Sequence, residues 1–152
     1  MARNVQKFDQ SKARDENEAA VKLATALGGV TIVQKGAVDR ITNGKGDVLI
    51  DSVEGSPRRC GGQGDLLSGS IATFLAWASG YQDGVGRDER ETKDKIPVEK
   101  HTLLAAYAGS VVTRHTSRET FKKLKRSMQA NDMIAEIGNT YETLFGQHDP
   151  KL

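Results

Sequence analysis

Apolar residues recur at helical spacing in four segments of the chain. In residues 15–27, "DENEAAVKLATAL", acids fill the first turn, where they complement the helix dipole. The same periodicity predicts helices over residues 65–79, from Pro97 onward and over residues 132–145. The residues expected to face inward are Ala20, Leu23, Ala24, Leu27, Leu67, Ile71, Phe74, Leu75, Ala78, Leu103, Leu104, Tyr107, Val111, Val112, Ile134, Ile137, Tyr141, Leu144 and Phe145.

Strand patterns lie between the first two predicted helices. The run "VTIVQ", residues 30–34, follows a glycine helix stop and predicts a buried strand. Asn43-Gly44, between "DRIT" and "DVLIDS", predicts a hairpin. A parallel α/β sheet needs several fully buried strands, and only one run here has that composition. We therefore expect an α/β fold in which residues 1–152 form the C-terminal portion of a single larger domain.

Composition excludes several classes of protein. The chain has 152 residues, with 22 basic and 20 acidic side chains and a net charge of +2, which argues against a dedicated nucleic-acid binder. Its single cysteine excludes an intrachain disulfide, and its three scattered histidines form no metal-ligand pattern. No apolar run approaches the roughly 18 residues of a membrane span. We expect a cytoplasmic or mitochondrial protein without membrane partners; the first ten residues carry no targeting segment.

The stretch "RRCGGQGDLLSG", residues 58–69, combines a glycine loop with the start of a predicted helix. N–H groups at a helix start have no intrahelical partner, and small residues let a phosphate approach them. The loop lacks the lysine of a P-loop, and Leu67 occupies the last glycine position of a dinucleotide fingerprint. It therefore predicts a different anion hole, with Arg58 and Arg59 just before it.

Asp65 follows this loop directly, although a carboxylate repels a bound phosphate. The conflict disappears if Asp65 contacts an acceptor hydroxyl while the loop N–H groups hold the transferring phosphoryl group. Asp65 would then be a general base, and the N–H groups would stabilise the developing charge. Aspartate is also a favoured N-cap residue, so ordinary capping is an alternative interpretation.

Four segments carry a resemblance to a known family. "GSPRRCGGQGDLLSGS", residues 55–70, resembles the G-x-G-D motif of ribokinase-like kinases, and more closely the eukaryotic ATP-dependent NAD(P)H-hydrate dehydratases. "TIVQKGAVD", residues 31–39, is similar to the K-G-x-x-D segment of that family. "NDMIAEIG", residues 131–138, resembles its C-terminal helix, and "NVQKF", residues 4–8, resembles its N-x-x-E-F stretch.

The resemblance implies a ribokinase-like layered sheet with flanking helices, of which this chain is the C-terminal portion. It also implies an enzyme that uses ATP to dehydrate (S)-NADHX and (S)-NADPHX, restoring NADH and NADPH with release of ADP and phosphate. Mg²⁺ is expected to accompany ATP. The alternatives are a ribokinase-like small-molecule kinase and a catalytically incomplete nucleotide-binding fragment. The oligomeric state stays open.

The resemblance assigns site residues to both substrates. Residues expected to contact ATP are Lys35, Gly36, Ala37, Val38, Asp39, Gly55, Ser56, Pro57, Arg58, Arg59, Cys60, Gly61, Gly62, Gln63 and Gly64. Residues expected to contact the hydrate are Asn4, Val5, Gln6, Lys7, Phe8, Asp9, Gln10 and Asp65. Asp65 is the expected catalytic residue.

Three smaller features have competing interpretations. A lysine that ends a strand is usually a solvated edge residue, but the spacing of Lys35 to the glycine block favours a phosphate contact. Cys60 has no histidine nearby in the sequence, which favours a packed side chain over a nucleophile. The basic run of residues 114–126 could attract an anionic dinucleotide, although a solvated helix end is the favoured interpretation.

Overall fold

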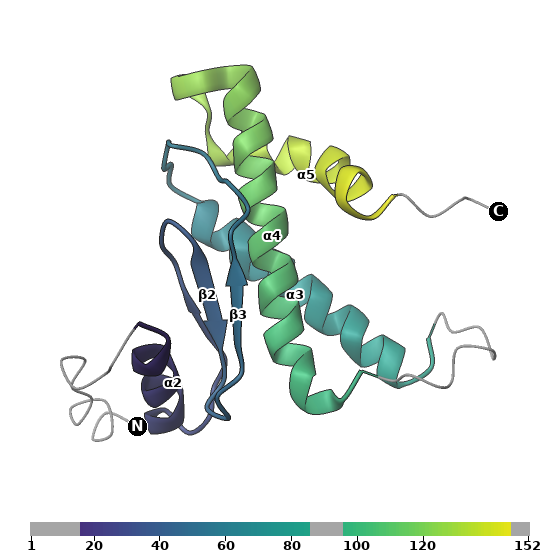
Figure 1. Cartoon of the computed structure of the whole chain (residues 1–152). Helices are drawn as coiled ribbons and strands as arrows, with labels where there is room; N and C mark the ends of the chain where they lie inside the picture. The colour runs from purple at the N-terminus through teal and green to yellow at the C-terminus, as the bar shows by residue number, and fades with distance from the viewer. Residues whose placement is uncertain (1–15, 86–95, 147–152) are drawn as a thin grey trace.

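The chain has a mixed α/β fold, as the sequence predicted (Figure 1). The computed structural model describes residues 16–85 and 96–146. In chain order the elements are α2 (Glu16–Ala26), β1 (Ile32–Gln34), β2 (Asp39–Thr42), β3 (Val48–Asp51), α3 (Gln63–Gln82), α4 (Val98–Leu124), the 3₁₀ turn η3 (Lys125–Ser127) and α5 (Ala130–Phe145). All four predicted helices are present. Within the described ranges, none of them combines the length and apolar composition that a membrane crossing requires.

The three strands form an antiparallel sheet in the order β1-β2-β3. The predicted hairpin is confirmed, since Asp39 pairs with Asp51 and Thr42 with Val48. Its turn is longer than an Asn-Gly turn. The Asn43 side chain accepts hydrogen bonds from the backbone N–H groups at positions 45 and 47, at 3.0 and 3.2 Å, and Gly46 takes a positive φ of 96°.

The prediction of a fully buried strand at residues 30–34 is wrong. Val30 is 40% exposed, and β1 itself is half-buried with an exposed Gln34. The physical reason is its position. β1 pairs antiparallel with β2, and no other described strand covers its far side. Its β-branched composition reflects strand propensity rather than complete burial.

Helices pack on both faces of the sheet because side chains alternate along β2. Ile41 is fully buried and packs against Leu103 and Ala106 of α4. Arg40 points the other way, and its Nε donates to Asn17 Oδ1 of α2 at 3.1 Å. The core between β2, β3 and α4 therefore fixes the positions where the loop before β2 and the loop after β3 join the sheet.

A glycine brings α3 close to α4. A Cβ on Gly109 would lie 2.6 Å from a side-chain atom of Ile71 and 2.9 Å from its backbone nitrogen. Only a residue without a side chain allows this approach. Because α3 is held against α4 here, its N-terminal end is placed beside the segment that follows β3 (Figure 1).

Several residues expected to face inward are exposed instead. Ile134 is 56%, Phe145 43% and Tyr141 38% exposed, and Leu104 of α4 is 37% exposed. α5 packs on α4 through a different stripe, in which Met133 is fully buried and Thr116 Oγ1 donates to Thr140 Oγ1 at 3.1 Å. The apolar stripe of α5 therefore turns toward α3.

An exposed aromatic surface results, which we call the α3–α5 apolar face. Phe74 and Phe145 meet edge-to-face with ring centroids 6.0 Å apart, and Trp77 meets Tyr141 at 5.8 Å. Trp77 is 52% exposed. Its members are Phe74, Trp77, Ile134, Tyr141 and Phe145.

Acid is expected to weaken the fold through His115 of α4. The residue is 8% exposed, and its Nδ1 has no hydrogen-bond partner within residues 16–85 and 96–146. Burial lowers the pKa of His115 from its ordinary value of 6.5, and the charge of Arg118 lowers it further. Lys122 acts in the same direction, while Glu119 and Glu136 oppose the shift.

The sign of the pH effect follows from this direction. The unfolded chain binds a proton at His115 more readily than the folded chain does. The folded state therefore keeps its full stability above about pH 6.5 and loses stability as the pH falls toward the folded pKa of His115. His115→Leu removes the titrating group. We expect the urea midpoint of the wild type to decline more steeply than that of the variant between about pH 7 and pH 5.5. Equal declines in the two proteins would contradict this assignment.

Candidate active site

The predicted glycine loop forms the N-terminal start of α3. The N-cap is Gly62, which has a left-handed φ of 91°. The first intrahelical bond runs from Leu66 N–H to the Gly62 carbonyl at 3.1 Å. The N–H groups of Gln63, Gly64 and Asp65 therefore have no intrahelical acceptor, and they lie at the positive end of the helix dipole.

Two of the three glycines leave space in front of these N–H groups. A Cβ added to Gly61 or Gly64 would meet no atom within 4 Å, whereas one on Gly62 would lie 2.7 Å from Ala130 Cβ. Gly62 is thus required by the backbone and by the contact with α5. Gly61 and Gly64 provide the open surface that an anion would need.

Asp65 lies on the first turn of α3 and is exposed. Its carboxylate has no hydrogen-bond or ion-pair partner in the part of the chain that the structure describes. The capping interpretation is wrong, because Gly62 is the cap residue and the helix start has no side-chain cap bond. The carboxylate is therefore available for another contact.

Asp65 also lines an open cavity of about 530 Å³ between α3 and α5. Both helices begin at its polar end, where Asp65 and Asn131 lie, and the apolar face of the two helices forms its other walls. Asn131 was predicted to lie in the family's C-terminal helix but not at the site. Its proximity to Gly62 depends on how α5 packs, which no local pattern shows. The full lining is Gly62, Asp65, Leu66, Gly69, Ser70, Thr73, Phe74, Trp77, Val112, Ala130, Asn131, Ile134, Ile137 and Tyr141.

The second predicted ATP segment, residues 35–39, forms the turn before β2. Lys35, Gly36 and Ala37 are exposed, and Lys35 has no described partner. Asp39 is fully buried, and its Oδ1 accepts the Gly36 N–H at 2.9 Å. The Asp39 carboxylate therefore shapes the turn, while the Lys35 side chain and the exposed backbone face solvent.

The third predicted segment, residues 55–60, is fastened to α4 and to the residue that follows η3. Ser56 N–H donates to Ser117 Oγ at 3.2 Å, and Arg58 Nε donates to the Met128 carbonyl at 3.2 Å. Arg58 is thus held against the protein, whereas Arg59 is exposed. Cys60 is half-buried, with a free thiol.

The basic run on α4 is not a uniformly solvated helix end. Arg114 points inward, with a side chain 13% exposed, and forms an ion pair with Asp39 at 3.0 Å. Further along, Arg118 and Lys122 pair with Glu119 at 3.1 and 2.8 Å. Both hydrogen bonds lower the pKa of Glu119, and the hydrogen bond from Lys122 has the larger effect. Only the outer residues of the run fit the predicted solvated surface.

The remaining predictions concern the hydrate segment and the metal. Residues 4–10 lie outside the described residues. Within those that are described, no group of three or more His, Cys, Asp or Glu side chains is arranged to hold a metal ion. The donor set does not fit a dedicated protein-held metal centre, and the binding of Mg²⁺ with ATP stays a prediction.

Gly64→Val is expected to weaken ATP binding by about tenfold or more with little change in melting temperature, because its Cβ projects into open space at the helix start. Gly62→Val is expected to lower both the ATP affinity and the melting temperature, since valine strains the positive φ and its Cβ collides with Ala130. Calorimetric titration with ATP and thermal melting of both variants measure the two effects. Equal losses of affinity and melting temperature in Gly64→Val would indicate a structural turn.

Comparisons with known proteins identify the family. A family model described as NAD(P)H-hydrate dehydratase matches residues 2–139. The chain is similar to the ATP-dependent (S)-NAD(P)H-hydrate dehydratase of Mycosarcoma maydis, at 46% identity over 88% of the chain and 39% of that protein. The enzyme of the same name from Mus musculus is 41% identical, over 89% of the chain and 37% of its own length. The chain thus spans less than two fifths of either relative, and it belongs to the NAD(P)H-hydrate dehydratase family.

Proposed function

We propose that this chain is the C-terminal portion of an ATP-dependent (S)-NAD(P)H-hydrate dehydratase and carries its phosphate loop and catalytic aspartate. The observation that carries the proposal is the start of α3. There, the open Gly61 and Gly64 and N–H groups without intrahelical partners share one helix start with Asp65, whose exposed carboxylate lines the cavity together with Gly62. The family assignment favours the hydrate as acceptor over the alcohol of a small-molecule kinase.

The chemistry needs one base and one anion hole. Asp65 takes the proton of the hydrate hydroxyl, whose oxygen then forms a bond to the γ-phosphorus of ATP as the bond to ADP breaks. The N–H groups of Gln63 and Gly64 stabilise the charge on the transferring phosphoryl group. The ring nitrogen lone pair then expels phosphate by breaking the C–O bond, and loss of a ring proton restores the dihydronicotinamide.

The proposed ATP contacts come from three segments. Lys35, Gly36 and Ala37 are exposed and would contact the nucleotide phosphates together with the half-buried Val38, and residues 55–60 bring the exposed Arg59 beside the loop. The negative phosphates would attract both free cations. Mg²⁺ would be held mainly by phosphate oxygens and water, which is its usual coordination with nucleotides.

The proposed hydrate contacts are Asp65 and residues 4–10. The acceptor hydroxyl would lie in the part of the cavity next to Asp65 and Asn131. We also propose that the protein is cytoplasmic or mitochondrial and has no nucleic-acid partner, because the hydrated cofactor is a soluble metabolite.

A chimera tests the function. In the chimera, the aligned segment of the Mycosarcoma maydis relative is replaced by the corresponding residues of this chain, which share 46% identity. We expect ATP-dependent recovery of dihydronicotinamide absorbance from NADH hydrate, with ADP and phosphate formed in equal amounts. Stable phosphorylation of a small alcohol without NADH recovery would support the kinase alternative. ATP binding without ADP release would support a binding fragment that has lost catalysis.

A further inference from the structure

We propose that Arg114 of α4 is a positioning residue that holds two of the ATP-binding segments at a fixed separation. The inference rests on the proposed function, because it assigns those segments to ATP. Arg114 belongs to neither the glycine block nor the lysine segment, and the sequence placed it in a basic run. Its role would be to act through the backbone of both loops rather than to touch the nucleotide.

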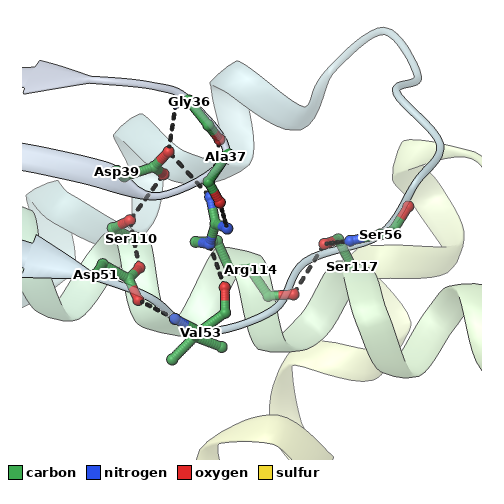
Figure 2. Close-up of polar contacts among 9 residues, drawn as sticks. All are labelled: Gly36, Ala37, Asp39, Asp51, Val53, Ser56, Ser110, Arg114 and Ser117. Carbon is green, nitrogen blue, oxygen red and sulfur yellow. Dashed lines mark hydrogen bonds and ion pairs between the residues drawn. The ribbon is translucent and has the colours of Figure 1, made fainter.

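The Arg114 guanidinium bridges the loop before β2 and the loop after β3 (Figure 2). Its Nη1 donates to Asp39 Oδ1 at 3.0 Å and to the Gly36 carbonyl at 3.3 Å, and its Nη2 donates to the Ala37 carbonyl at 2.5 Å. Its Nε donates to the Val53 carbonyl on the other loop. One side chain therefore fastens three backbone carbonyls from two segments.

Buried hydroxyl groups on α4 extend this connection in both directions. Ser110 Oγ lies 3.0 Å from Asp39 Oδ2 and 2.6 Å from Asp51 Oδ2, so it joins the ends of β2 and β3 from which the two loops leave (Figure 2). One turn beyond Arg114, Ser117 Oγ accepts the Ser56 N–H. A single face of α4 thus sets the path of both loops.

Only arginine fits this position. Its guanidinium carries five N–H donors in a planar fork, and the side chain here is 13% exposed, so a lost donor leaves the part-buried Val53 carbonyl or the buried Asp39 carboxylate without its partner. Lysine could retain the ion pair with Asp39, but one nitrogen cannot span both loops. ATP needs Lys35 and the glycine block at the same time, so a change in loop separation should weaken its binding.

Arg114→Lys tests the inference, with Arg118→Lys as the matched control. Arg118 lies one turn further along α4 and pairs with Glu119 alone among the described residues. In the full chain we expect the Arg114→Lys dissociation constant for ATP to rise about tenfold, while Arg118→Lys stays at the wild-type value. Hydrogen exchange should accelerate in residues 35–37 and 53–56 and stay unchanged in α3.

In the chimera, Arg114→Lys should raise KM for ATP and leave KM for the hydrate unchanged, a split that general destabilisation would not produce. An unchanged ATP affinity, or equal rises in both KM values, would overturn the positioning role. If the wild-type chain and the chimera both fail to bind ATP, the proposed function fails and this inference falls with it. Wild-type binding that Arg114→Lys leaves intact overturns this inference alone.

Discussion

Asp65→Asn is expected to lower turnover of the chimera by about 10²-fold or more, the usual scale for loss of a general base. The substitution preserves size, and the helix start does not depend on this side chain, since Gly62 is the cap. ATP affinity should hold or improve, because a negative charge beside the phosphates is removed. Single-turnover recovery of NADH from its hydrate and calorimetric titration with ATP measure the two quantities.

Asp83→Asn is the control for this experiment. Asp83 is also exposed and lies at the opposite end of α3, where it is the C-cap residue. The control should turn over at the wild-type rate. Near-normal turnover in Asp65→Asn would remove Asp65 from the role of base, and the carboxylate would then have a binding role only.

The local features of the fold were predictable because short-range physics determines them. Glycine stops, acidic first turns and 3.6-residue periodicity located the four helices, and the Asn43-Gly44 pair located the hairpin. The burial of individual faces was less predictable. Ile134, Tyr141 and Phe145 have the periodicity of a core face, yet α5 buries Met133 and Thr140 instead. Periodicity shows that an apolar face exists, but not which element covers it.

The candidate site likewise has residues that the sequence could locate and residues that it could not. Gly61 to Asp65 could be located from the sequence, because the motif is contiguous and its chemistry depends on a helix start. Arg114 could not, since its partners lie more than 60 residues away in the chain. Asp39 was expected among the ATP contacts, whereas its buried side chain shapes the turn. Tertiary hydrogen bonds therefore distinguish residues that face a ligand from residues that position others.

The chain of 152 residues by itself is expected to be marginally stable and to lack dehydratase activity. It spans 39% of its Mycosarcoma maydis relative, and we expect residues outside the aligned segment to complete the hydrate site. The glycine loop that we propose to bind phosphate nevertheless forms a regular helix start with open space at Gly61 and Gly64. ATP binding and turnover should therefore separate in this chain.

The α3–α5 apolar face is the physical reason why we expect low stability. Trp77 is 52% and Ile134 56% exposed, and aromatic rings continue the surface between them. A cluster of this kind on a soluble protein marks a surface that another element covers, or a site of aggregation. Burying one such side chain contributes about 1.5–3 kcal/mol, so leaving several exposed removes a large part of a marginal stability.

Circular dichroism melting, light scattering and the NADH-recovery assay on the purified chain test this expectation. We expect a broad, low-temperature transition, concentration-dependent association and no NADH recovery above the level without protein. Ile134→Lys places a charge on the most exposed member of the face, and it should reduce association without restoring turnover. A sharp cooperative transition together with substantial turnover would show that these residues form a complete enzyme, and that the exposed face is an ordinary surface.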